Sequence, residues 1–167
     1  FIRIRVGTKR RMPSTIWSWV SPNRSPMAAA LVNDAARPRE ICSANPPPPP
    51  RVIAASAGLA ANEGEPTSKE AVAVLEEAGV PNTPENDYRH HVARNLTERM
   101  MREADAVVPI SGAHAMQILL RYPAYASKVR QLPMDIPDPY GQGVDAYRLC
   151  LSQLKLALSM CSFGEEQ

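Results

Sequence analysis

The sequence has few cysteines and no apolar run of membrane-spanning length. Its three cysteines, Cys42, Cys150 and Cys161, are odd in number and lack the spacing of metal ligands. A transmembrane helix needs roughly 20 consecutive apolar residues, and no segment has this length or the pattern of a signal peptide. We therefore expect a cytoplasmic chain with reduced thiols, no metal, no other cofactor and no membrane partner.

An excess of charge of one sign is also missing. The 19 Lys and Arg residues nearly balance the 17 Asp and Glu residues, which leaves a net charge of +2. The chain as a whole therefore generates little long-range field to attract nucleic acid, and we expect no nucleic-acid partner. Basic residues gather only within residues 3–11, where they fit a solvated tail better than a binding patch.

The length of 167 residues suits one domain. We predict a basic extension over residues 1–14, whose origin, native or artefactual, the sequence leaves open. The domain then covers residues 15–160, and a short tail covers residues 161–167. A proline-rich insertion at about residues 37–50 ends in five consecutive prolines, which favour an irregular or polyproline II surface loop.

Short apolar segments alternate with helical patterns through the domain. The expected strands are 14–20, 51–58, 105–111 and 128–134, and the expected helices are 27–36, 69–78, 98–104, 113–122 and a C-terminal helix with Leu151 and Leu154 on one face. This alternation predicts an α/β fold, in which a doubly wound, four-stranded parallel sheet carries helices on both faces in three layers. Such sheets bind ligands at the carboxyl ends of their strands, so the loop before the first helix is the natural place for an anion.

Cap residues mark the starts of the expected helices. Ser25 is the expected N-cap of the first helix, with Pro26 at the first helical position. Thr67 or Ser68 precedes the second helix, where Val72, Leu75 and Ala78 are expected to share a buried face, and Gly79 follows its end. Thr97 precedes the third helix in the same way.

Four motifs occur in an order and spacing that resembles the low-molecular-weight protein-tyrosine phosphatases, including their bacterial protein-arginine phosphatase branch. They are NRSPMAAAL, SAGL, HVARNLT and DIPDPYG, and the resemblance covers residues 17–158. It implies the fold of that family and the hydrolysis of phosphomonoesters through a covalent phosphocysteine, without a metal. The implied partner is a phosphorylated protein or a small phosphomonoester, and the oligomeric state stays open.

The resemblance also implies roles for residues near the first helix. The family loop is a Cys, five residues, then Arg and Ser. Arg24 matches the Arg, whose planar fork can hold two phosphate oxygens. Ser25 matches the hydroxyl that hydrogen-bonds the nucleophile, Asn23 stands where the family often has Cys, and Ser18 falls at the position of the nucleophilic Cys. We expect Ser25 and Asn23 to contact the substrate.

The late motif supplies the remaining implied site residues. Asp138 matches the general acid that protonates the leaving group, and Tyr140 matches the wall against which a substrate ring lies. Pro139 and Gly141 shape the turn. Of the histidines, His91 is expected to be a structural hydrogen-bonding residue and His114 a surface residue, and Asp135 an exposed carboxylate.

The nucleophile loop departs from the family pattern. A serine hydroxyl is a far weaker acid than a thiol and stays protonated where a thiol would ionise. Val20 replaces a Gly and resists positive φ, and Pro22 has no N–H for an anion. We therefore expect this copy to be inactive or strongly impaired. Two questions stay open: whether the ancestral substrate was phosphotyrosine or phosphoarginine, and whether the chain is a non-catalytic module that binds a phosphorylated partner.

Overall fold

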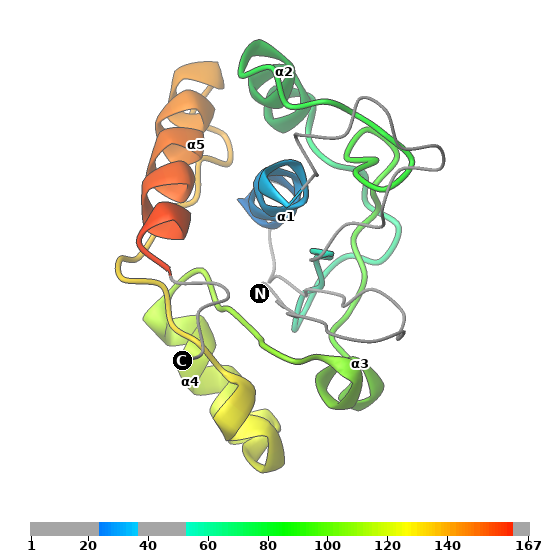
Figure 1. The fold of residues 1–167 in the computed structure, drawn as a ribbon, viewed down its shortest axis with the longest axis vertical. Helices are drawn as coiled ribbons and strands as arrows, with labels where there is room; N and C mark the ends of the chain where they lie inside the picture. Colours follow the sequence, from blue (N-terminus) through cyan, green and yellow to red (C-terminus); the bar gives the residue numbers. More distant parts are fainter. Residues whose placement is uncertain (1–23, 37–52, 162–167) are drawn as a thin grey trace, which may run out of the picture.

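The computed structural model describes residues 24–36 and 53–161 (Figure 1). Its elements are the helices α1 (Arg24–Ala35), α2 (Lys69–Glu77), α3 (Glu98–Glu103) and α4 (Gly112–Arg121), the 3-10 helix η1 (Pro123–Lys128) and the helix α5 (Val144–Ser159). None of the helices within these two ranges is long and apolar enough to cross a membrane. The expected first strand, the N-terminal extension and the proline-rich insertion lie outside the described residues.

Helix α1 begins two residues earlier than expected, at Arg24 instead of Pro26. Ser25 therefore lies within the first turn, and the prediction that it is the N-cap is wrong. Pro26 is tolerated there because the N–H groups of a first turn have no partner within the helix. Residues 24–32 are all buried, so α1 is enclosed on every side instead of presenting one apolar stripe.

Side-chain caps start the next three helices. The Ser68 side chain accepts a hydrogen bond from the backbone N–H of Ala71, and Thr97 caps α3 as expected by accepting one from Met100. Ser111 accepts from the backbone N–H of His114 at the start of α4. Each bond satisfies an N–H that has no partner within its helix.

Extended segments meet through isolated β-bridges in the described ranges. Gly58 pairs in parallel with Asn95, and Val107 pairs in parallel with Val129, which joins the third and fourth expected strands. The second contact cannot extend far, because Pro109 and Pro133 lack the N–H that a ladder requires. The four-stranded sheet stays a prediction, since its expected first strand is outside the described residues.

Two apolar clusters form the core. The larger cluster joins α1, α2 and α5 and includes the fully buried Met27, Leu75 and Leu154. The smaller one lies around α3 and α4 and includes Met101 and Ile118. Figure 1 shows α1 in the centre, with α2 and α5 beside it, and α1 packs against both helices.

Candidate functional site

Arg24, at the start of α1, contacts Asp138 of the DPYG motif and Ile136 just before it. Its side chain is only 9% exposed, and its Nη2 atom lies 3.2 Å from Oδ2 of Asp138. Its Nη1 atom donates a hydrogen bond to the backbone carbonyl of Ile136. Two residues that are 114 positions apart are thus brought into direct contact, which agrees with the expectation that Arg24 and Asp138 share one site.

One donor of the Arg24 fork remains unused. Its Nε atom is buried and has no hydrogen-bond partner in the part of the chain that the structure describes. Buried polar groups in proteins are almost always hydrogen-bonded, and an unsatisfied one costs about 1–3 kcal/mol. A guanidinium binds oxyanions through two adjacent N–H groups, and Nε can supply one of them.

The DPYG turn fixes the carboxylate of Asp138. Oδ1 accepts a hydrogen bond from the backbone N–H of Tyr140 at 3.2 Å, while the Asp138 carbonyl accepts one from the Gln142 side chain at 2.7 Å. The backbone N–H of Gln142 donates to the Pro139 carbonyl, and Gly141 has φ 73°. This β-turn favours Gly at its third position because of the positive φ.

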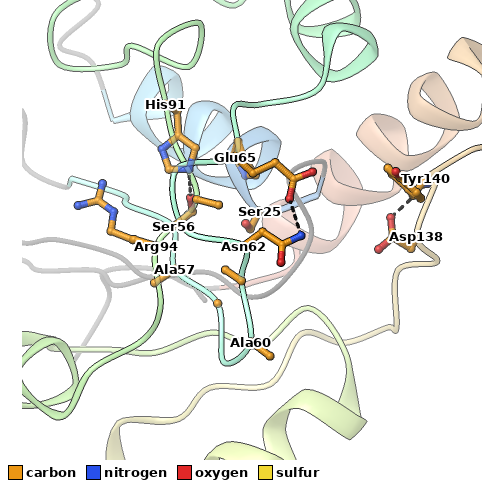
Figure 2. Close-up of a pocket in the computed structure, with 14 residues that line it drawn as sticks. Ser25, Ser56, Ala57, Ala60, Asn62, Glu65, His91, Arg94, Asp138 and Tyr140 are labelled. Carbon is orange, nitrogen blue, oxygen red and sulfur yellow. Dashed lines mark hydrogen bonds between the residues drawn. The ribbon is translucent and has the colours of Figure 1, made fainter.

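A cavity of about 310 Å³ opens beside these residues (Figure 2). Its size is near the lower end of the range for ligand pockets, roughly 300–1,000 Å³. The lining includes Ser25, Asp138 and Tyr140, all three of which the sequence assigned to the site. Tyr140 is 69% exposed and stands at the rim, so its ring is available to a ligand.

A serine and a histidine form a part-buried contact in the same cavity. Ser56 is 2% exposed, and its Oγ atom lies 2.7 Å from Nε2 of His91. Burial is the main cause that lowers the pKa of His91 to about 4, and the positive charge of Arg94 lowers it further. His91 is therefore neutral at pH 7 and acts as a hydrogen-bonding residue, as expected.

The expectation for His114 is wrong. This residue is half-buried, its Nδ1 atom lies 2.8 Å from Oγ of Ser111, and burial and the nearby charge of Arg24 lower its pKa to about 4. No pattern in the sequence indicated this, because Arg24 is distant from His114 along the chain. Asp135 is exposed as expected, and its Oδ1 atom also accepts a hydrogen bond from the backbone N–H of Gly112 at 2.9 Å.

The structure brings Arg24, Ser25, Asp138 and Tyr140 to one place. Ser18 and Asn23, the other two assigned residues, lie outside the described residues, and the chemical roles of all six stay predictions. Sequence reasoning did not assign four polar residues of the lining, Ser56, Asn62, Glu65 and Arg94. Ser56 and Arg94 lie within two of the motifs, whereas nothing in the sequence pointed to Asn62 or Glu65.

Residues 24–36 and 53–161 contain no group of three or more His, Cys, Asp or Glu side chains placed to hold a metal ion. At the start of α1, Ser25 and Pro26 line the cavity, and the buried guanidinium of Arg24 contacts Asp138, which also lines it. A helix N-terminus and a guanidinium both favour an oxyanion.

Comparison with known proteins agrees with this chemistry. The sequence model of the family described as low molecular weight phosphotyrosine protein phosphatase matches residues 21–161. The chain is 30% identical over 136 residues to the probable low molecular weight protein-tyrosine-phosphatase EpsP of Ralstonia solanacearum, covering 79% of this chain and 81% of that protein.

Solved structures of phosphatases are also similar to this chain. The arginine phosphatase YwlE from Geobacillus stearothermophilus has a TM-score of 0.70 and 27% identity, covering 88% of this chain and 89% of that chain. Another structure is described as a cysteine-to-serine mutant of the arginine phosphatase YwlE with a phosphorylated active-site serine. It has a TM-score of 0.69 and 28% identity and covers 88% and 91% of the two chains. These neighbours place the chain in the α/β class.

Proposed function

Because the chain belongs to the low molecular weight phosphotyrosine protein phosphatase family, we propose that Arg24 and the first turn of α1 bind the phosphoryl group of a phosphorylated protein or small phosphomonoester. The observation that supports this most directly is the buried, unused Nε donor of Arg24. A phosphate oxygen would satisfy it, and the positive end of the α1 dipole would favour the same anion.

The remaining roles follow from the positions around Arg24. Ser25 lies in the first turn and lines the cavity, where its hydroxyl would bond the phosphoryl group or the nucleophile, and Asn23 would contact the same ligand. A phosphate on Arg24 would compete with Asp138 for the guanidinium. Asp138 would then be free to act as the general acid towards the leaving group, with Tyr140 flanking it.

The nucleophile position decides how much catalysis remains. The family match begins after Ser18, so the assignment of Ser18 to the cysteine position rests on its spacing from Arg24 alone. The phosphorylated active-site serine in the solved cysteine-to-serine mutant of a relative indicates that a serine in such a loop can carry a phosphoryl group. We propose that Ser18 attacks phosphorus poorly, because nothing assigned to the loop would accept its proton, and that turnover is strongly impaired.

We further propose the four-stranded parallel sheet, a domain spanning residues 15–160 with a proline-rich insertion at about 37–50, and a cytoplasmic location. Phosphotyrosine and phosphoarginine both remain candidate ancestral substrates.

A non-catalytic binding module is the second candidate function. The observation that favours it is that the contact of Arg24 with Asp138 and the unused Nε donor occur in a chain that has a serine at the predicted nucleophile position. Such a module would hold a phosphorylated protein without releasing phosphate.

The test combines turnover and anion binding on the full chain. We expect hydrolysis of p-nitrophenyl phosphate near background. Vanadate and phosphate should bind at about millimolar level, which corresponds to roughly 4 kcal/mol, because a helix terminus and one guanidinium supply only part of the family cradle. Calorimetric titration should detect this binding in the natural chain and in an Arg99→Ala control, whose arginine is exposed on α3. It should not detect it in Arg24→Ala or Arg24→Lys, provided that circular dichroism shows both to be folded.

Each other outcome has a definite meaning. Turnover at a rate typical of the family would contradict the assignment of an impaired nucleophile. Micromolar anion binding without turnover would favour the binding module. Equal binding by the natural chain and by folded Arg24→Lys would remove the proposed phosphate site.

A further inference from the structure

One wall of the cavity is a short loop, residues 58–65, that is tied down at both ends. The backbone N–H of Gly58 donates to the Arg94 carbonyl at 2.7 Å, and the N–H of Gly64 donates to the Ala93 carbonyl at 2.9 Å. The side chain of Asn95 accepts from the N–H of Ala61 at 2.8 Å and donates to the Ala61 carbonyl. The wall is therefore formed before any ligand arrives, which lowers the cost of binding.

The loop ends in a turn that presents Glu65 to the cavity. The backbone N–H of Glu65 donates to the Asn62 carbonyl at 3.1 Å, and Gly64 supplies a positive φ of 84°. The Asn62 side chain donates to Oε2 of Glu65 at 3.3 Å. Both residues line the cavity, and Figure 2 shows this pair on a different segment from Asp138 and Tyr140.

The second carboxylate of this turn, Glu63, bonds to the neighbouring segment and not to the cavity. Oε1 of Glu63 accepts a hydrogen bond from the Asn95 side chain at 3.1 Å, and Glu63 is not part of the cavity lining. Glu63 therefore holds the wall in place, whereas Glu65 is the carboxylate that a ligand meets on this side.

The rest of this wall offers little to an aromatic ligand. Its other lining residues are the small Gly58, Ala60 and Ala61, and Tyr140 is the one Phe, Tyr or Trp residue in the lining that the structure describes. A ligand whose phosphoryl group binds Arg24 would meet Glu65 on this side of the cavity, whereas Asp138 would serve as the proton donor and Arg94 is the basic residue of the lining. A carboxylate attracts a neighbouring cation and repels an anion, so Glu65 favours a ligand that carries a positive charge on this side.

We infer that this cavity selects phosphorylated ligands that carry a cationic N–H donor beside the phosphoryl group, and that Glu65 is the residue that determines this specificity. The inference rests on the proposed phosphate site at Arg24. The cation has two chemical sources, the guanidinium of a phosphoarginine or a basic side chain next to another phosphorylated residue. Both would place N–H donors against Glu65.

The experiment measures the binding of matched peptides to the full chain by fluorescence anisotropy. Four peptides of equal length carry phosphotyrosine next to arginine, phosphotyrosine next to serine, phosphotyrosine next to glutamate, or phosphoarginine next to serine. Unphosphorylated versions show the contribution of the phosphate. The variants are Glu65→Gln, which keeps an acceptor for Asn62, Glu65→Lys, and Glu103→Gln as a control for loss of one exposed carboxylate on α3.

We expect at least one of the two cationic phosphopeptides to bind about twofold to fivefold more tightly than the phosphotyrosine peptide next to serine, the range for a partly exposed ion pair. The cationic phosphopeptide that binds more tightly identifies the chemical source of the cation. Glu65→Gln should abolish the preference, Glu65→Lys should shift it to the glutamate peptide, and Glu103→Gln should leave it unchanged.

Two results would overturn the inference in distinguishable ways. Phosphate-dependent binding without a preference for cations, or with a preference that survives both Glu65 variants, would leave the phosphate site intact and refute the role of Glu65. Equal binding of phosphorylated and unphosphorylated peptides would refute the phosphate site and this inference with it.

Discussion

The pKa of His91 depends strongly on the residues around it. Its ring contacts buried Ser56, and burial together with the charge of Arg94 lowers its pKa from 6.5 to about 4. The unfolded chain therefore binds a proton on this histidine at a higher pH than the folded chain does. Protonation favours unfolding, so the stabilising effect is complete above about pH 6.5 and is lost as the pH falls towards 4. His114 acts in the same direction, with a pKa of about 4.

We expect the free energy of unfolding to decrease as the pH is lowered from 7 to 4.5, by about 1–2 kcal/mol for each of these two histidines, after allowance for their partial exposure. Urea denaturation at several pH values measures it. His91→Gln should reduce the dependence, because it removes the group whose pKa is lowered. An unchanged pH profile in His91→Gln would show that this histidine titrates normally in the folded chain.

At the scale of elements, the helix starts depend on local signals, and most of them were predictable. Thr97 caps α3 as expected, and the sequence allowed either Thr67 or Ser68 before α2. The structure selects Ser68, while Thr67 is buried and its hydroxyl has no hydrogen-bond partner among the described residues. Thr67 and Ser68 fit the sequence pattern of an N-cap equally well. The path of the backbone into α2 decides which hydroxyl reaches the N–H of Ala71.

Replacement of Ser68 by alanine should lower the free energy of unfolding by about 1 kcal/mol, the usual cost of losing an N-cap side chain. The physical reason is that the N–H of Ala71 loses the acceptor that Ser68 supplies. Chemical denaturation compares it with Ser152→Ala on the exposed side of α5, whose hydroxyl donates a hydrogen bond to the Arg148 carbonyl one turn earlier. Equal stabilities of the two variants would contradict the assignment of Ser68 as the cap.

Features that depend on distant parts of the chain were predicted less well. The buried residues of α2 are Ala71, Val74 and Leu75, whereas the expected Ala78 is exposed. Helical spacing fixes which residues share a side, but the packing of α1 and α5 decides how far along α2 that side is covered. Glu65 was missed for the same reason, since it reaches the cavity only because Asn95 and Ala93 hold its loop.

At the scale of the whole molecule, α1 connects the core to the site. Its residues from Arg24 to Val32 are all buried, and it packs against both α2 and α5. Arg24, at its start, contacts the backbone of Ile136 and the carboxylate of Asp138. The position of the guanidinium therefore depends on how firmly this central helix is packed, and a loss of packing one turn away should affect both stability and ligand binding.

Met27 provides the test of that dependence, because it is fully buried in the larger apolar cluster and lies one turn beyond Arg24. Met27→Ala should lower the free energy of unfolding by about 2–5 kcal/mol, since it removes buried apolar contacts and leaves a cavity. The control, Met116→Ala on α4, removes the same atoms from a side chain that is 59% exposed, and it should change stability by less than about 1 kcal/mol. Urea denaturation gives both values, and vanadate titration under native conditions shows whether binding weakens in Met27→Ala alone. A cost below 1 kcal/mol for Met27→Ala would mean that α1 is not the centre of the core.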